Sequence, residues 1–212
     1  THKYCQPLIM DTLDKVGAQS IVVGATDLNK NLESLAQVWT ALSEHGASRK
    51  SLLINLGGGM ITDLGGFAAS TFKRGIKYIN IPTTLLSMVD ASVGGKTGIN
   101  FNGLKNEIGV FNPASIVIID TNFLRSLDEE NVLSGYGEMI KHGLISNVEH
   151  WAELLQFDVR QPDYEHLKQM VGTSIKVKED SVEKDPFEQN IRKALNFGHT
   201  VGHAFESLSI KE

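Results

Sequence analysis

The stretch SLLINLGGGMITDLGGFAAST, residues 51–71, decides the fold of this chain. Its first six residues form an apolar run that is typical of a buried parallel strand, and Gly57-Gly58-Gly59 ends that run. The small residues of 63–71 then favour a helix. A strand, a glycine turn and a helix in this order let backbone N–H groups approach a diphosphate at the helix N-terminus. A tight turn that binds nothing is the alternative, because the glycines lack the GxGxxG spacing.

Other segments repeat this alternation of strand and helix. Apolar, β-branched runs predict strands at 20–24, 51–56, 77–82 and 115–120. Helical spacing is present at 32–45 and then, from about residue 126 onward, at 127–146, 164–179 and 186–208. The sequence therefore predicts an α/β domain with a mostly parallel sheet over 1–125, followed by an all-helical domain over 126–212.

Composition narrows the class of protein. The chain has 212 residues, of which 41% are hydrophobic, so it can bury a real core. Its net charge is −5 without any run of Lys or Arg, which argues against a nucleic-acid or membrane partner. Cys5 is the single cysteine, and no signal peptide precedes it, so we expect a cytoplasmic protein without an internal disulfide. A start without Met suggests a fragment.

Two further segments of the first half carry groups that suit phosphates. TTLLSMVDASVGGKTGIN begins with two hydroxyls directly after a predicted strand and continues to Asp90, a Gly-Gly turn and Lys96. NGLKNE adds Lys105 on an expected loop. Two lysines on glycine-rich turns beside an acid favour anion binding, whereas solvated loop lysines are the alternative.

A polar stripe marks the predicted helix at 186–208. Arg192, Asn196, His199 and His203 stand four, three and four residues apart, which places them within about 60° of one helical face. Two imidazoles at this spacing can reach one metal ion, and the cation and amide suit an anion. A solvated face with incidental histidines is the alternative.

The segment GYGEMIKHG places Glu138 one helical turn from Lys141 and His142. A surface ion pair would explain this spacing without any function. The small, apolar neighbours argue instead that the carboxylate faces the protein interior. Opposite His199 and His203, Glu138 would complete a carboxylate–imidazole metal site.

Five motifs together resemble the 3-dehydroquinate synthase family of the sugar-phosphate cyclases. They are GGGMITDLGGFAASTFKRG, TTLLSMVDASVGGKTGIN, LKNEIGVFNP, GYGEMIKHG and ALNFGHTVGHAFE, in that order. The resemblance covers nearly the whole chain and implies a dehydroquinate synthase-like fold. Family members are longer at both ends, so the chain is expected to be truncated. It lacks the first strand of the nucleotide-binding half and stops before the family's third metal ligand, a histidine.

The resemblance implies two cofactors, NAD and a divalent metal that is zinc or cobalt. The positions that match the family's NAD pocket are Asp27, Lys30, Gly58, Gly59, Met60, Ile61, Thr62, Asp63, Thr83, Thr84, Asp90, Lys96, Lys105, Phe123, Leu124, Arg125 and Ser126. Asp27 departs from the family, which usually has Glu there. Two of the three metal ligands match Glu138 and His199.

Substrate contacts are implied in the same way. They match Lys96, Lys105, Asn106, Lys141, Arg192, Asn196 and His203, the last beside the metal as a proton-transfer group. Arg74 matches an arginine that reaches the phosphate in the neighbouring subunit's site, so the resemblance implies a homodimer.

The implied reaction belongs to the shikimate pathway of aromatic amino acid biosynthesis. In it, 3-deoxy-arabino-heptulosonate 7-phosphate becomes 3-dehydroquinate and phosphate, through transient oxidation by NAD, phosphate elimination, re-reduction and an intramolecular aldol closure. A sibling cyclase that makes an inosose, valiolone or amino-dehydroquinate product is an alternative. A glycerol-dehydrogenase-like enzyme and a catalytically inactive fragment are two others.

Overall fold

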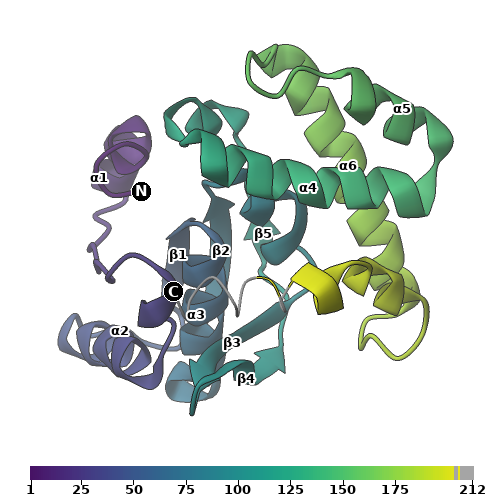
Figure 1. The fold of residues 1–212 in the computed structure, drawn as a ribbon. Coiled ribbons are helices and arrows are strands. Elements are labelled where there is room, and N and C mark those ends of the chain that lie inside the picture. Colours follow the sequence, from purple (N-terminus) through teal and green to yellow (C-terminus); the bar gives the residue numbers. More distant parts are fainter. Residues whose placement is uncertain (203–204, 206–212) are drawn as a thin grey trace. The chain divides into compact units, whose positions relative to one another are not determined.

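The structure is a computed structural model and describes residues 1–202 and 205. The chain divides into two compact units, Thr1–Tyr136 and Gly137–Glu212, and Figure 1 labels their elements. The boundary at residues 125/126 stays a prediction about domain organisation. The α-helices are α1 (Met10–Lys15), α2 (Leu32–Glu44), α3 (Gly59–Thr71), α4 (Glu129–Ser146), α5 (Val148–Gln156) and α6 (Tyr164–Lys184). The strands are β1 (Leu52–Gly57), β2 (Lys77–Pro82), β3 (Lys96–Phe101), β4 (Leu104–Phe111) and β5 (Ile116–Val117).

The first unit contains the predicted parallel sheet. Its strands follow the order β1-β2-β5, and both neighbouring pairs are parallel. Gly57 is in register with Pro82, so the chain leaves β1 and β2 at the same edge of the sheet. The glycine turn after β1 and the hydroxyls after β2 therefore lie side by side. The last strand is shorter than predicted and covers only Ile116 and Val117.

Helix α3 packs against this sheet (Figure 1). Close approach is possible because Gly65 faces β1: a Cβ there would lie 2.0 Å from Asn55 Oδ1. Asn55 is buried and donates to Asn80 Oδ1 on β2 over 2.9 Å. Leu64 and Phe67 of α3 join the main hydrophobic cluster with residues of α2, β2 and β3.

The predicted strand at 20–24 is wrong. The structure gives this segment no strand pairing, although its β-branched residues suit a strand. Ile21 and Val23 pack against the hydrophobic cluster, and the Val22 carbonyl accepts a hydrogen bond from Gln37 Nε2 at 3.0 Å. A β-branched run becomes a strand only where a neighbouring backbone forms a ladder with it.

The hairpin β3–β4 corrects the expectation that Lys105 lies on a loop. The two strands are antiparallel, and Lys105 lies within β4. Asn102 and Gly103 form the turn, with φ of 50° and 78°. An Asn-Gly pair between two strands is the preferred two-residue hairpin turn because both positions need positive φ.

The second unit is helical, as predicted. Side chains cap its helices: Asn147 Oδ1 accepts from the His150 N–H at 2.7 Å, and Asp163 Oδ1 accepts from the Glu165 N–H at 3.0 Å. Helix α6 runs five residues beyond the predicted end at 179. No helix in the described part of the chain has the length and hydropathy needed to cross a membrane.

The continuous helix predicted over 186–208 is wrong. Residues Ile191–Asn196 form a 3₁₀ helix, which ends where Phe197 is extended and Gly198 has a φ of 81°. A left-handed residue breaks the helical repeat, so the residues before and after Gly198 do not follow one helical face.

An acid directly before the 3₁₀ helix organises this segment. Asp185 accepts from the backbone N–H groups of Gln189, Asn190 and Arg192 at 2.8, 2.6 and 3.2 Å. Burial raises the pKa of Asp185, but these N–H groups outweigh it and leave the pKa below its usual range.

Candidate functional site

The first group of predicted site residues lies at the glycine turn after β1. Gly58 is the N-cap of α3, and among the described residues no side chain caps this end of the helix. A Cβ on Gly58 would lie 3.0 Å from Thr84 Cγ2, so the turn runs against the segment after β2. Met60, Ile61 and Thr62 form the first helical turn. This geometry suits an anion held by backbone N–H groups.

Hydroxyl groups border the same edge. The Thr83 N–H donates to the Gly57 carbonyl at 2.9 Å, which ties the two segments together. Thr84 Oγ1 donates to Ser87 Oγ at 2.9 Å. Asp90 follows in the short helix Ser87–Ala91. The structure thus brings Thr83 and Thr84 to the glycine turn, as the sequence motifs suggested.

A buried lysine joins the turn to the hairpin. Lys30 Nζ lies 2.5 Å from Asp63 Oδ2 and also donates to Asn106 Oδ1, although it is 33 residues from the first and 76 from the second. Only 4% of the Lys30 surface is exposed. Burial raises the pKa of Asp63 to about 6, while the nearby Lys30 charge opposes that rise.

Asn100 extends this network and was missed by the sequence reasoning. Its Nδ2 donates to Asp27 Oδ2 at 3.0 Å, and its Oδ1 accepts from the Asn106 N–H at 2.9 Å. Its own N–H donates to the Lys30 carbonyl at 2.8 Å. The available signal was the position of Asn100 two residues before the Asn-Gly turn, which folds β4 back onto β3.

The other predicted residues of this unit are less closely associated. Lys96 pairs with Phe111 at one end of the hairpin, whereas Lys105 follows Leu104 at the other end, so their shared site stays a prediction. Arg74 is exposed on a turn where it and both neighbours have positive φ. The last four residues of the predicted NAD pocket lie in a 3₁₀ helix, Thr121–Ser126, in which Phe123 and Leu124 are buried and Arg125 Nε donates to Asn122 Oδ1.

The second unit holds its own cluster of charged groups. Glu138 Oε1 forms an ion pair with Lys141 Nζ, and His142 Nε2 lies 3.3 Å from the same oxygen. Lys141 Nζ also donates to the Leu195 carbonyl and lies 3.4 Å from His199 Nε2. One buried ammonium therefore contacts both predicted metal ligands, Glu138 and His199.

The rest of the predicted stripe is dispersed. Arg192 is buried and donates through NH1 to the Pro186 carbonyl at 2.7 Å. Asn196 Nδ2 donates to Glu188 Oε1 at 2.6 Å. The shared helical face of Arg192, Asn196 and His199 is therefore wrong, because the first two lie in a 3₁₀ helix with three residues per turn and Gly198 separates that helix from His199. His203 lies outside the described residues.

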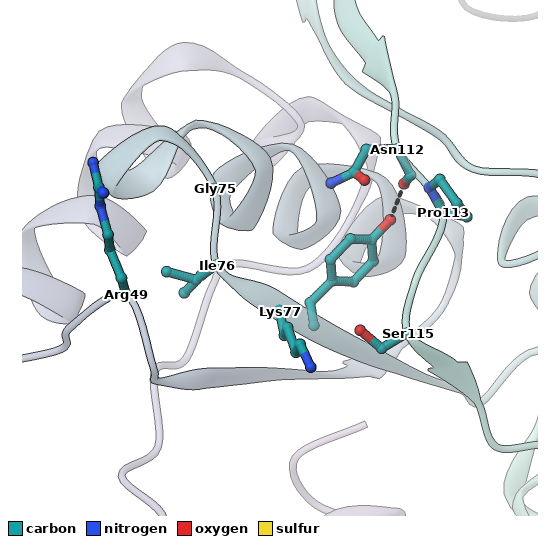
Figure 2. A pocket seen from close by; sticks show the side chains of 8 residues that line it. Arg49, Gly75, Ile76, Lys77, Asn112, Pro113 and Ser115 are labelled. Carbon is teal, nitrogen blue, oxygen red and sulfur yellow. Dashed lines mark hydrogen bonds between the residues drawn. The ribbon is translucent and has the colours of Figure 1, made fainter.

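A separate hollow of about 280 Å³ lies at the amino end of β2, away from the glycine turn (Figure 2). Tyr78 is one of its lining residues, and the Tyr78 hydroxyl donates to the Asn112 carbonyl. Burial and the Asp63 charge raise the pKa of Tyr78 to about 12. No predicted site residue is among its lining residues, which are Arg49, Gly75, Ile76, Lys77, Tyr78, Asn112, Pro113 and Ser115.

A parallel sheet with a glycine turn at its carboxyl edge places the first unit in the class of open α/β proteins, which bind their ligands at that edge. The family description "3-dehydroquinate synthase N-terminal" matches residues 20–134, and "3-dehydroquinate synthase C-terminal" matches residues 135–212. The chain therefore belongs to the 3-dehydroquinate synthase family.

Individual relatives agree with this assignment. A 3-dehydroquinate synthase from Parabacteroides distasonis is 63% identical over 209 residues, which are 99% of this chain and 59% of the relative. A 2-epi-5-epi-valiolone synthase from Streptomyces hygroscopicus, solved with NAD⁺ and Zn²⁺, superposes with a TM-score of 0.81 at 29% identity, covering 92% of this chain and 57% of that one.

A second solved cyclase has the same fold. It is a 2-deoxy-scyllo-inosose synthase complexed with carbaglucose-6-phosphate, NAD⁺ and Co²⁺, with a TM-score of 0.87 at 25% identity. The match covers 96% of this chain and 58% of that structure. The chain thus spans somewhat more than half the length of the relatives it matches.

Proposed function

We propose that this chain contributes the NAD-binding and metal-binding residues of a 3-dehydroquinate synthase. The substrate would be 3-deoxy-arabino-heptulosonate 7-phosphate and the products 3-dehydroquinate and phosphate. The observation that carries the proposal is the match of both family halves in order, with 63% identity to a relative of that name. The two solved cyclases bind NAD⁺ together with Zn²⁺ or Co²⁺, which supports the same cofactors here.

The residues at the glycine turn fit a dinucleotide. Among the described residues no side chain caps the N-terminus of α3, so its first N–H groups suit a diphosphate. The Asp27 carboxylate accepts hydrogen bonds and would hold the hydroxyls of a ribose. Lys30 is itself held by Asp63 and Asn106, so its role is to position these segments. NAD would supply the transient oxidation of a substrate hydroxyl.

The residues of the second unit fit a metal. A carboxylate oxygen and an imidazole nitrogen are ligands that zinc and cobalt accept, and Glu138 and His199 both contact the Lys141 ammonium. A bound metal would act as a Lewis acid on the substrate oxygens. Lys141 donates hydrogen bonds as a cation and would orient an anionic or hydroxylated substrate at this position.

A homodimer would complete the proposal. Arg74 is exposed on a strained turn, where a side chain can extend toward another molecule. In such a dimer its guanidinium would bind the substrate phosphate of the partner's site.

Phosphate release from the full chain tests this function. With NAD and Co²⁺ present, the heptulosonate phosphate should release phosphate and yield 3-dehydroquinate, whereas glucose 6-phosphate should not react. Lys141→Ala should lower kcat by about 10²–10³-fold, the usual effect of losing one group that stabilises charge in a transition state. Lys176→Ala, an exposed lysine of the same unit, is the matched control. Turnover of glucose 6-phosphate alone would instead indicate an inosose-type sibling.

A further inference from the structure

The hairpin β3–β4 is irregular at Asn100. This residue lies alone between two regular pairs of the ladder on β3, whereas the same interval of β4 contains Lys105, Asn106 and Glu107. Extra residues of this kind form a bulge, which redirects side chains and is common beside active sites. Asn106 lies in the bulge with a φ of 54°, a conformation that residues other than glycine adopt only where their surroundings hold them.

The side chain of Asn100 holds Asn106 in this conformation. Asn100 Oδ1 accepts from the Asn106 N–H at 2.9 Å, which gives that N–H a partner at a position where the ladder has no regular pair. The Asn100 N–H donates to the Lys30 carbonyl at 2.8 Å, and Asn106 Oδ1 accepts from Lys30 Nζ. The bulge is therefore fixed from both sides by residues of the first unit.

The other end of the same amide contacts Asp27. Asn100 Nδ2 donates to Asp27 Oδ2 at 3.0 Å and to the Asp27 carbonyl at 3.4 Å. A carboxylate only accepts hydrogen bonds and a backbone N–H only donates them, so these two partners fix which way the amide points. Asp27 and Asn106 are both exposed, so the amide orders two surface groups and adds nothing to the hydrophobic core.

We propose that Asn100 is a positioning residue that couples the cofactor site to the substrate site. This inference rests on the proposed function, in which Asp27 holds the ribose of NAD and Asn106 contacts the substrate. A ribose bound by Asp27 would hold the Asp27–Asn100 contact in place, and Asn100 would keep Asn106 turned for the substrate. The sequence motifs assigned no role to Asn100.

Two substitutions in the full chain separate the two ends of the amide. Asn100→Ala removes both contacts and should raise the Kd of NAD and the KM of the heptulosonate phosphate, each about two- to tenfold, the range expected for one lost hydrogen bond. Asn100→Asp keeps an acceptor for the Asn106 N–H but sets a carboxylate against Asp27. It should therefore weaken NAD binding more than Asn100→Ala does, while KM at saturating NAD stays near the wild-type value.

Calorimetry gives the Kd of NAD, and phosphate release at saturating NAD and Co²⁺ gives KM and kcat. Glu107→Gln, an exposed neighbour in the same bulge, is the matched control and should leave both constants unchanged. Circular dichroism verifies that each variant is folded.

The outcomes separate this role from a structural one and from the proposed function. A lower thermal midpoint for Asn100→Ala with wild-type Kd and KM would show a purely structural residue and overturn the coupling, while the proposed function stands. A raised Kd with an unchanged KM in Asn100→Ala would also overturn it, because the substrate end would be independent of Asn100. Absence of phosphate release from the wild-type chain would overturn the proposed function and the coupling together.

Discussion

Each unit of the protein holds a buried lysine paired with a carboxylate, but the two pairs differ in what surrounds them. Lys30 and Asp63 belong to a network in which Asn106 and Asn100 complete the hydrogen bonds. Lys141 and Glu138 lie beside a buried imidazole that has no such partner among the described residues. The first pair is a complete polar network that holds segments in place. The second pair lies at the residues that the proposed function assigns to the metal site.

The largest expected effect comes from removing the lysine of the second pair. Lys141→Met keeps the length of the side chain but leaves the Glu138 carboxylate buried without its ammonium partner. Loss of one partner of a buried ion pair costs about 3–5 kcal/mol, and the measurement is denaturant unfolding at neutral pH. Lys176→Met provides the exposed control. Zinc should restore part of the lost stability, and a variant as stable as wild type without metal would contradict the comparison.

Next in size is the pH dependence of the first pair. The pKa of Asp63 is raised from 3.8 to about 6, so the folded protein holds this proton more tightly than the unfolded chain does. The resulting stability is present below the unfolded pKa and is lost as pH rises through the folded pKa. Between about pH 4 and pH 7, the free energy of unfolding of wild type should fall by on the order of 2 kcal/mol more than that of Asp63→Asn. Parallel stability curves for the two proteins would show that Asp63 does not titrate in this way.

A smaller effect is expected on NAD binding. NAD should raise the thermal midpoint of the full chain by an amount set by its concentration relative to its Kd. Lys30→Met should reduce that shift, because Asp63 and Asn106 lose the ammonium that joins them. Each tenfold loss of affinity lowers the stabilisation by about 1.4 kcal/mol at saturating NAD. Lys50→Met, an exposed lysine of the same unit, should keep the wild-type shift.

The smallest expected effect on stability comes from Asn100, at the edge of the network around Lys30 and Asp63. Asn100→Ala removes hydrogen bonds to the exposed Asp27 and to the Asn106 N–H. Water can replace part of these hydrogen bonds, so the free energy of unfolding, measured with denaturant, should fall by only about 1 kcal/mol. A loss as large as that of Lys141→Met would mean that the two clusters do not differ as described.

Much of the first unit could be predicted because its signals are local. The apolar run before the glycine turn, the helix at 32–44 and the strand at 77–82 each carry their own periodicity. Their parallel pairing follows from the alternation of strands and helices. The missed hairpin was also encoded locally, in Asn102-Gly103, and the error was to leave that signal unused.

The clusters could be predicted only in part. The motifs named Lys30, Asp63, Asn106, Glu138 and His199, but periodicity alone does not pair Lys30 with a carboxylate 33 residues away. Helical periodicity also gave a wrong prediction at 186–208. The polar stripe that starts at Arg192 assumed one continuous helix, which the left-handed Gly198 interrupts. His142 is fully buried, which its spacing from Glu138 in the GYGEMIKHG motif did not predict.

By itself, the sequence determined the family, the strand–turn–helix core and the residue types available for the two clusters. The tertiary structure decided which of these residues meet. It joined Lys30 to Asp63 and Asn106, set His142 against Glu138, and turned Arg192 toward the Pro186 carbonyl. The physical reason is that hydrogen bonds and ion pairs act over a few ångströms in space, whereas the spacing of a motif constrains only neighbours along one helix or strand.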